Sequence, residues 1–495
     1  MRDGGAVVNA EDIARDAQFR EGFTLVDYAE VGLPVFRLTV EAVTTNTRVL
    51  PTIHEFAMRC LALGERDDHA IARMLGLKND VMRGAIDALV LEGLVTRTSL
   101  VADLSTFALT SQGEERLATE IEEVVQEEMI VFDYDGIRRM PIRLAGENVM
   151  RASDLKAYGA VEIRPYPADA PGLSDLAIPE VSRVIRRQGS EDFRRNLLAL
   201  KRTVRRNNVF REAVALVFAA DKGDEVQVAF VINGKSSESH ERAFAEHAGP
   251  KKMGFLRMLA ETADRRRLDR SFGKDVLKVL PEPARLRDIR REEAEARAQI
   301  RSIEPALEMN LGRKNGASAT AAMTAAKERL GLVMQDLASF ELRPLACYEQ
   351  DELLAEAISQ ARRSLLITSA GLQAPLLTQH VLRDLEKLSR ERVMIRIASF
   401  LAPQTESRGG DHYDPLAATS KLTQKTSLEL IHTARSVFFF LIQDDELAVI
   451  SNRPFFGDMV RRSGFQRVEG YVSREPTMIR RIREMAEAAC RPKNG

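Results

Sequence analysis

The 495-residue sequence contains no tryptophan, only three cysteines and no long apolar run. Cys60, Cys347 and Cys490 lie far apart, without a CxxC pair or a histidine at ligand spacing, which argues against a zinc site and a disulfide framework. No segment approaches the ~18 consecutive apolar residues of a membrane span, and the N-terminal residues lack the apolar core of a signal peptide. We therefore expect a cytoplasmic protein that has no membrane contact, no metal and no cofactor.

An excess of charge of either sign is also missing. Lysine and arginine number 72 against 73 aspartates and glutamates, which gives a formal net charge of -1. A nearly neutral protein has no overall field that attracts nucleic acid or an anionic membrane, so any such binding must be local. Because 44% of the residues are hydrophobic, the chain has enough apolar material for several cores. We expect a multidomain protein of mixed α/β and α+β class.

Changes in composition divide the chain into five consecutive segments. They are an N-terminal extension with short strands (1–49), a helical region ending in short strands (50–120), a central α+β domain with a basic helix (121–283), a charged helical arm (284–340) and a C-terminal α/β domain (341–495). The central domain has no residue pair at a catalytic spacing. The arm either separates two domains or provides a dimer seam, since its apolar positions are too irregular to decide.

Residues 50–120 predict three helices, two short strands and a further helix. The third helix has an apolar stripe that includes Val81, Ile86 and Leu89, and the pattern then alternates through LVTRTS and TFALTSQG. This order of elements resembles the winged helix-turn-helix of many bacterial and archaeal regulators. The resemblance implies DNA binding through the third helix and the hairpin.

The charge of the third helix leaves two interpretations open. Its outward residues are Lys78, Asn79, Asp80, Arg83, Asp87 and Glu92. A helix in the major groove offsets phosphate charge with lysine and arginine and reads bases with arginine, asparagine or glutamine. One interpretation is sequence-specific DNA binding through Lys78, Asn79, Arg83 and, from the hairpin, Arg97. The other is a module that docks a protein.

The most basic segment is residues 183–211, with ten lysines or arginines and two acids. Apolar residues recur there at helical spacing, which predicts a basic amphipathic helix. Its charged side consists of Arg195, Arg202, Arg205 and Arg206. We expect this side to contact nucleic acid, because Arg202 and Arg206 are one helical turn apart and suit adjacent phosphates. The alternative is a solvated face or a docking surface for an acidic partner.

The segment VFFFLIQDDELAVISNRPFF (437–456) predicts a strand, a tight turn and a second strand. It resembles the signature of the phospholipase D superfamily, which is His-x-Lys, four residues, Asp, six residues and Gly-Ser-x-Asn. The motif positions are taken here by Val437, Phe439, Asp444, Ser451, Asn452 and Pro454. Only the aspartate matches. The resemblance therefore implies a parallel sheet covered by helices, without the nucleophilic histidine and the phosphate-binding lysine of the family.

His432 precedes this motif and is the remaining candidate for a displaced nucleophile, with Asp444 or Asp445 as its partner. It lies five positions before the histidine position of the motif, so we expect a loop or helix-end histidine and no enzyme activity.

Three functions remain open for the whole chain. We prefer a non-enzymatic nucleic-acid-binding or scaffold subunit of a bacterial DNA-handling assembly, such as a phage-defence system, with nucleic acid, other proteins or further copies of the chain as partners. A winged helix before an inactive phospholipase-D-like domain is also similar to the archaeal TrmB-like sugar-responsive repressors, which implies a ligand-responsive regulator. The third function is a phosphodiesterase with a displaced site.

Overall fold

The computed structural model describes residues 9–48, 50–101, 104–119, 122–144, 149–186, 195–309, 316–373, 376–400, 414–457 and 464–490. The chain forms two compact units, the first from residues 1–34, 147–168 and 209–495 and the second from 35–146 and 169–208. Two 26-residue strands, β1 (Phe23–Arg48) and β8 (Arg195–Ala220), have residues in both units. The protein is therefore of mixed α/β class, but its units are discontinuous in sequence, unlike the consecutive segments predicted above.

In the second unit, β1 pairs antiparallel with β4 (Glu122–Asp135), and β4 pairs with β5 (Met140–Ile142). Alternate residues of the long strands, such as Leu38 and Phe132, form an apolar core with helix α7 (Ile178–Arg186). A short 3₁₀ helix, Leu173–Asp175, precedes α7. The prediction of short strands before residue 49 is wrong, because residues 23–48 form the single continuous strand β1, whose alternate apolar side chains are buried.

Between β1 and β4 the chain forms helices α2 (Thr52–Ala62), α3 (Asp68–Met74) and α4 (Asn79–Leu91), strands β2 (Val95–Val101) and β3 (Leu104–Leu109), and helix α5 (Ser111–Ala118). This order confirms the elements predicted for residues 50–120. Asp67 begins α3 because its carboxylate accepts the N–H groups of His69 and Ala70. Helix α4 ends before Gly93, whose φ of 73° favours glycine. The helices and the hairpin share one apolar core.

The first unit begins with helix α1 (Ala10–Asp16) and includes β6 (Val149–Met150), α6 (Ala152–Tyr158), β7 (Val161–Glu162), β9 (Val226–Ile232) and β10 (Lys235–Ser236). Strand β9 pairs antiparallel with β8 from Val214 to Ala219. Five helices follow, namely α8 (Glu238–Glu246), α9 (Gly249–Lys252), α10 (Phe255–Thr262), α11 (Arg265–Phe272) and α12 (Lys274–Leu277).

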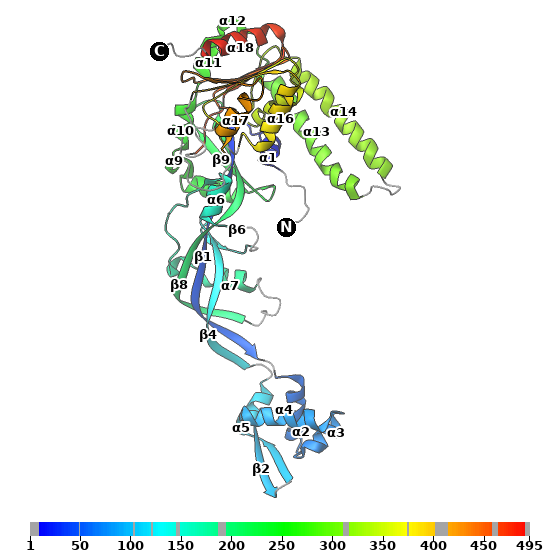
Figure 1. Ribbon diagram of the computed structural model, residues 1–495. Helices are drawn as coiled ribbons and strands as arrows, with labels where there is room; N and C mark the ends of the chain where they lie inside the picture. The colour runs from blue at the N-terminus through cyan, green and yellow to red at the C-terminus, as the bar shows by residue number, and fades with distance from the viewer. Residues whose placement is uncertain are drawn as a thin grey trace. The chain divides into compact units, whose positions relative to one another are not determined.

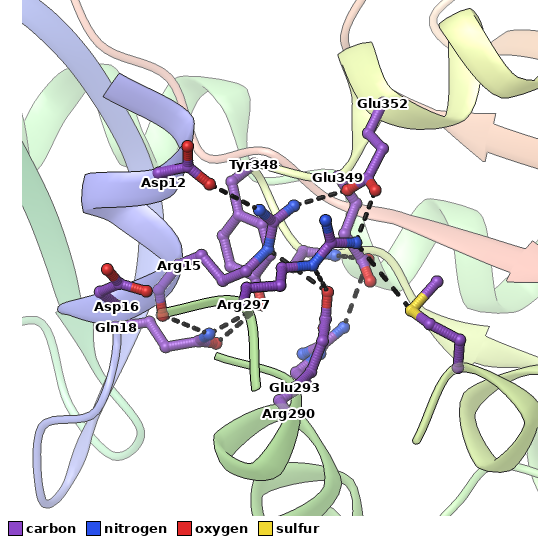
Figure 2. A network of polar contacts seen from close by, with 12 residues as sticks. Asp12, Arg15, Asp16, Gln18, Arg290, Glu293, Arg297, Tyr348, Glu349 and Glu352 are labelled. Atoms are coloured by element: carbon purple, nitrogen blue, oxygen red, sulfur yellow. Dashed lines mark hydrogen bonds and ion pairs between the residues drawn. The ribbon is translucent and has the colours of Figure 1, made fainter. Parts of the chain in front are cut away.

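The charged arm is a pair of helices, α13 (Pro283–Met309) and α14 (Gly316–Ala338), which lie side by side (Figure 1). Arg290 and Arg297 of α13 contact carboxylates at the start of the C-terminal domain (Figure 2). Arg301 of α13 pairs with Asp12 and Asp16 of α1. Arg15 of α1 is 3% exposed and contacts Glu293 of α13 at 3.4 Å and Glu352 at 2.6 Å. Arg297 contacts the same two carboxylates. The side of α13 that carries Glu293 and Arg297 is therefore occupied by ion pairs within the first unit.

The C-terminal sheet has the strand order β11-β17-β16-β15-β12-β13-β14. The strands are β11 (Arg343–Pro344), β12 (Ser364–Ser369), β13 (Met394–Ser399), β14 (Glu429–His432), β15 (Phe439–Gln443), β16 (Leu447–Ser451) and β17 (Gly470–Ser473). Parallel pairs join β12 to β13 and β13 to β14, whereas the other pairs among the described strands of this sheet are antiparallel, so the expected parallel sheet is in fact mixed.

Four helices accompany this sheet, namely α15 (Gln350–Gln360), α16 (Gln379–Arg390), α17 (Pro415–Thr423) and α18 (Pro476–Ala489). Side chains of α15 and α16 form one apolar core with one face of the sheet. Side chains of α18 form a second core with the other face, and Figure 1 shows α18 lying across it. Both faces of β15 and β16 are therefore buried, which explains their continuous apolar sequences.

Candidate functional site

The two motif positions that would carry phosphodiesterase chemistry are filled by apolar side chains that pack in different cores. Phe439 is buried in the core shared with α15 and α16, where its ring stacks on Phe400 with centroids 6.2 Å apart. Val437 is half-buried against the core on the α18 side. Neither side chain can attack phosphorus or bind a phosphate oxygen. These two positions therefore contribute to packing.

Asp444, the matching motif residue, has a structural role in the turn between β15 and β16. Its carboxylate accepts hydrogen bonds from the backbone N–H groups of Arg362, Arg363 and Ser364 at 2.7–2.8 Å. Burial by itself would raise the pKa of Asp444, but these hydrogen bonds hold the pKa below its ordinary value. The carboxylate is therefore ionised at neutral pH and fixes the start of β12 to the turn.

The remaining polar motif residues also bind protein groups. The Ser451 hydroxyl is buried and donates to Gln350 Oε1 at 2.9 Å. Asn452 donates to the carbonyl oxygens of Thr262 and Arg467 at 3.0 and 2.8 Å. These hydrogen bonds hold the segments around the end of β16 together, and they use the groups that a substrate would otherwise bind.

The carboxyl ends of the parallel strands bring Ser369, Ser399 and His432 into one register. Ligands of open α/β sheets bind at such an edge, so these residues are the natural place for a displaced site. However, the Ser369 hydroxyl donates to the Gly371 carbonyl at 2.9 Å and the Ser399 hydroxyl to the Ala370 carbonyl at 3.2 Å. His432 is the exposed last residue of β14, not a loop or helix-end residue.

Residues 401–413, which follow β13, lie outside the described part of the chain. Within the described residues, no group of three His, Cys, Asp or Glu side chains is placed to hold a metal ion. In the same part of the chain, every helix is too short or too polar to cross a bilayer.

The residues proposed to read DNA from α4 do not form one basic surface. Lys78 and Asn79 are exposed at the start of the helix. Arg83 instead turns toward α3, where its Nε lies 3.2 Å from Asp68 Oδ2 and its Nη2 lies 3.1 Å from His69 Nε2. Arg83 therefore has an acidic partner within the same domain.

Arg97 lies on the hairpin that the resemblance identifies as the wing. Its Nε donates to the Ser105 hydroxyl on the neighbouring strand at 3.0 Å, and its guanidinium lies 5.9 Å from the centre of the Phe107 ring. The side chain remains exposed, so it stays available to a binding partner.

The expected basic helix is a strand, which is a correction to the sequence interpretation. Residues 195–211 belong to β8, where successive residues rise about 3.3 Å, so Arg202 and Arg206 are roughly 13 Å apart along the strand and not one helical turn apart. Leucine, lysine and arginine favour helices only weakly, and pairing with neighbouring strands overrides that preference. The four arginines therefore do not share a helical face.

The described arginines of β8 differ in their partners. Arg202 forms an ion pair with Glu41 of β1, and Arg205 donates to Asn207 Oδ1 at 3.2 Å. Lys201 pairs with Glu127 of β4. Arg206 is exposed, without an ion pair to any residue in the described ranges, and the side chain of Arg195 lies outside them. The segment is thus partly neutralised by acids that are distant in the sequence.

Nothing local in the sequence marks these acids as partners of the basic residues in β8. Arg202 and Glu41 are 161 residues apart, and Lys201 and Glu127 are 74 residues apart. The alternation of polar and apolar residues in β1 was the available signal that a long strand would bring such residues together.

No protein-family model and no curated protein matches this chain. It is similar to the solved structure of Nuc, a phospholipase D family member from Salmonella typhimurium, with 15% identity and a TM-score of 0.21 over 28% of this chain and 84% of that one. It is also similar to TrmBL2, described as an archaeal chromatin protein with a novel mode of DNA binding, with 17% identity and a TM-score of 0.21 over 35% of this chain and 63% of that one.

A third structure is the phosphatidylserine synthase of Haemophilus influenzae Rd KW20, with 11% identity and a TM-score of 0.20 over 34% of this chain and 46% of that one. At these scores none of the three likenesses establishes a shared fold or a shared activity.

Proposed function

We propose that this protein is a non-enzymatic scaffold subunit of a bacterial DNA-handling assembly, with a winged helix at residues 50–120 and a C-terminal phospholipase-D-like domain without catalytic activity. The observation that carries this proposal is the packing of Val437 and Phe439 in two separate apolar cores. A small movement of β15 could not restore phosphodiester cleavage, because neither side chain has a group that attacks phosphorus or binds phosphate. The choice of a DNA-handling assembly, of which phage defence is one kind, rests on the domain composition alone.

Phosphodiesterase assays test the catalytic part of this proposal. The purified chain should not cleave single-stranded DNA, duplex DNA, RNA, phospholipid or bis(p-nitrophenyl) phosphate. The double substitution Val437→His and Phe439→Lys should not produce activity, because the two side chains contact different cores and a buried lysine would disturb one of them. Cleavage by the wild-type chain that is lost in His432→Ala would refute the proposal and identify a displaced site.

The surface of α4 favours docking of a protein over reading of DNA. Its exposed acids Asp80, Asp87 and Glu92 outnumber its exposed bases Lys78 and Arg83, and Arg83 also pairs with Asp68. Carboxylates repel the phosphates of DNA, whereas the same carboxylates complement a basic protein surface. We therefore assign the winged domain to protein contacts within the assembly.

A second candidate function is direct contact with nucleic acid, favoured by the exposed side chains of Lys78, Asn79 and Arg206. If Asn79 reads a base, Asn79→Ala should lower specific affinity by roughly 1–3 kcal/mol while non-specific affinity stays the same. A regulator of the TrmB-like type would in addition change its DNA affinity when a sugar binds. Equal binding of wild type and variant to every duplex would leave only the scaffold function.

A further inference from the structure

A shallow groove of about 510 Å³ lies between α2 and α4 in the winged domain. One wall comes from the start of α2 and includes Ile53 and His54. The other comes from α4 and includes Val81, Gly84 and Ala85. A Cβ atom at Gly84 would meet no heavy atom within 4 Å, so the glycine leaves the middle of the groove open.

The groove exposes apolar side chains that a protein of this kind usually buries. Ile53 is 37% exposed and Val81 45% exposed. Phe56, one turn after Ile53 on α2 and outside the groove lining, is 47% exposed. Contiguous apolar groups that are rimmed by polar residues mark interaction sites. The groove therefore has the composition of a contact surface.

Two carboxylates of α4 flank the groove without lining it. Asp80 and Asp87 stand four residues before and three residues after Gly84, which places them on the same side of the helix as the glycine. Neither has an ion pair with any residue in the described ranges. An occupant with lysine or arginine beside its apolar residues would complement both carboxylates, whereas a DNA phosphate would be repelled.

We propose that this groove docks an amphipathic helix of a partner protein, with apolar residues on one side and lysine or arginine along its edges. The walls come from two helices and the residue before α2, so the groove presents no strand edge that could pair with an extended peptide. Grooves between helices characteristically receive a third helix. This inference deepens the scaffold function proposed above and rests on it.

Binding of a defined probe tests the groove directly. The probe is a fluorescent synthetic helix with leucine on one face and lysine on the other, and its control is the same helix with glutamate in place of lysine. The full-length chain should bind the lysine helix in a fluorescence anisotropy titration and should bind the glutamate helix much more weakly. Gly84→Met, which fills the groove, should weaken binding of the lysine helix roughly tenfold, as for a central interface residue.

Two variants control for correct folding and for non-specific hydrophobic binding of the probe. Gly84→Ala adds a single methyl group to open space and should keep the circular dichroism spectrum of the wild type. Met74→Gln removes an exposed apolar side chain of α3 that does not line the groove, and it should leave binding unchanged. Equal affinity of wild type, Gly84→Met and Met74→Gln for the lysine helix would refute the groove as its site.

Photocrosslinking from position 81, in cells that carry the gene, identifies the occupant and separates the two proposals. A benzophenone amino acid at position 81 should crosslink to a lysine- or arginine-rich helical segment of another protein, and Gly84→Met should abolish the crosslink. A crosslink to a second copy of this chain, or none at position 81 when other positions crosslink to partner proteins, would overturn the groove proposal and leave the scaffold function intact. A crosslink to DNA at position 81 would overturn both.

Discussion

The arginines of α13 and those of β8 occur at similar density in the sequence but have different surroundings. Arg290, Arg297 and Arg301 of α13 have side chains that are 14%, 20% and 21% exposed, and each contacts a carboxylate of the first unit. Arg202 of β8, by contrast, is 72% exposed although it is also ion-paired. These three arginines of α13 join parts of one unit, whereas Arg202, Arg205 and Arg206 of β8 face solvent.

This difference shows that a count of basic residues does not identify a nucleic-acid interface. A buried arginine with a carboxylate partner has no charge available for phosphate, and removal of either partner leaves an unpaired charge in a poorly solvated place. An exposed arginine in an ion pair is screened by water and salt, so its partner holds it only weakly. The two regions should therefore respond differently to substitution, acid and salt.

The largest effect is expected for Arg15, which lies between α1, α13 and α15 in the buried network. Arg15→Met keeps the volume of the side chain but leaves Glu293 and Glu352 without one of their cations. We expect a loss of about 3–5 kcal/mol in the unfolding free energy, the usual cost of breaking a buried ion pair. Denaturant unfolding followed by circular dichroism measures it.

The double variant Arg15→Met and Glu293→Gln is the matched control for this prediction. Burial raises the pKa of Glu293, so a neutral glutamine should restore part of the lost stability. If Arg15→Met unfolds at the same denaturant concentration as the wild type, the network does not stabilise the first unit.

The second prediction concerns the loss of folding stability at low pH. Burial alone would raise the pKa of Glu349, but Arg343 at 2.8 Å and Arg290 at 3.6 Å lower that pKa from 4.5 to about 2. Because the pKa is lower in the folded state, Glu349 contributes its full stability above about pH 4.5 and loses it as the pH falls toward 2. Glu349→Gln should flatten the stability–pH curve in this window.

Salt distinguishes this buried pair from the surface pair of Arg202 and Glu41. The pKa of Glu41 is also lowered, by its hydrogen bond to Arg202, but the Arg202 side chain is 72% exposed, so water and salt reach the pair. High salt should therefore screen the contribution of Glu41 and leave that of Glu349 nearly unchanged. Identical salt responses of Glu41→Gln and Glu349→Gln would show that the ion pairs of the two regions do not differ in their access to solvent.

The third prediction tests whether the arginines of β8 contact phosphates at all. Each phosphate contact on a duplex contributes about -0.9 to the slope of log affinity against log salt. The double variant Arg205→Gln and Arg206→Gln should flatten the slope by at most roughly two units, less than four arginines on one helix would require. An unchanged slope would exclude Arg205 and Arg206 from phosphate contact.

The smallest effect is expected when Glu41 is changed to glutamine. The ion pair lies at the surface, so the unfolding midpoint should stay the same within error. Arg202 is then released, and any nucleic-acid affinity of this strand should rise with a slope steeper by up to about 0.9. A measurable loss of stability instead would show that the pair supports the sheet.

Much of the local structure could be predicted from the sequence because short-range patterns encode it. The apolar stripe around Ile86 and the terminating Gly93 define α4, and the alternation after it defines the hairpin of β2 and β3. The turn at Asp444 was also visible, since it separates two apolar strands. In these places a pattern among neighbouring residues marks the element, even though the Asp444 side chain itself binds backbone groups some eighty residues away.

The sequence by itself determined that Val437 and Phe439 cannot perform the chemistry of the motif they resemble, because the identity of a side chain fixes which atoms it can offer. Only the tertiary structure decided that residues 195–211 form a strand and that Arg202 finds its acid in β1. Apolar residues at mixed spacing suit either a helix or a strand, and pairing with distant strands settles that choice. The groove between α2 and α4 likewise exists only once the two helices pack, because its walls come from residues some thirty positions apart.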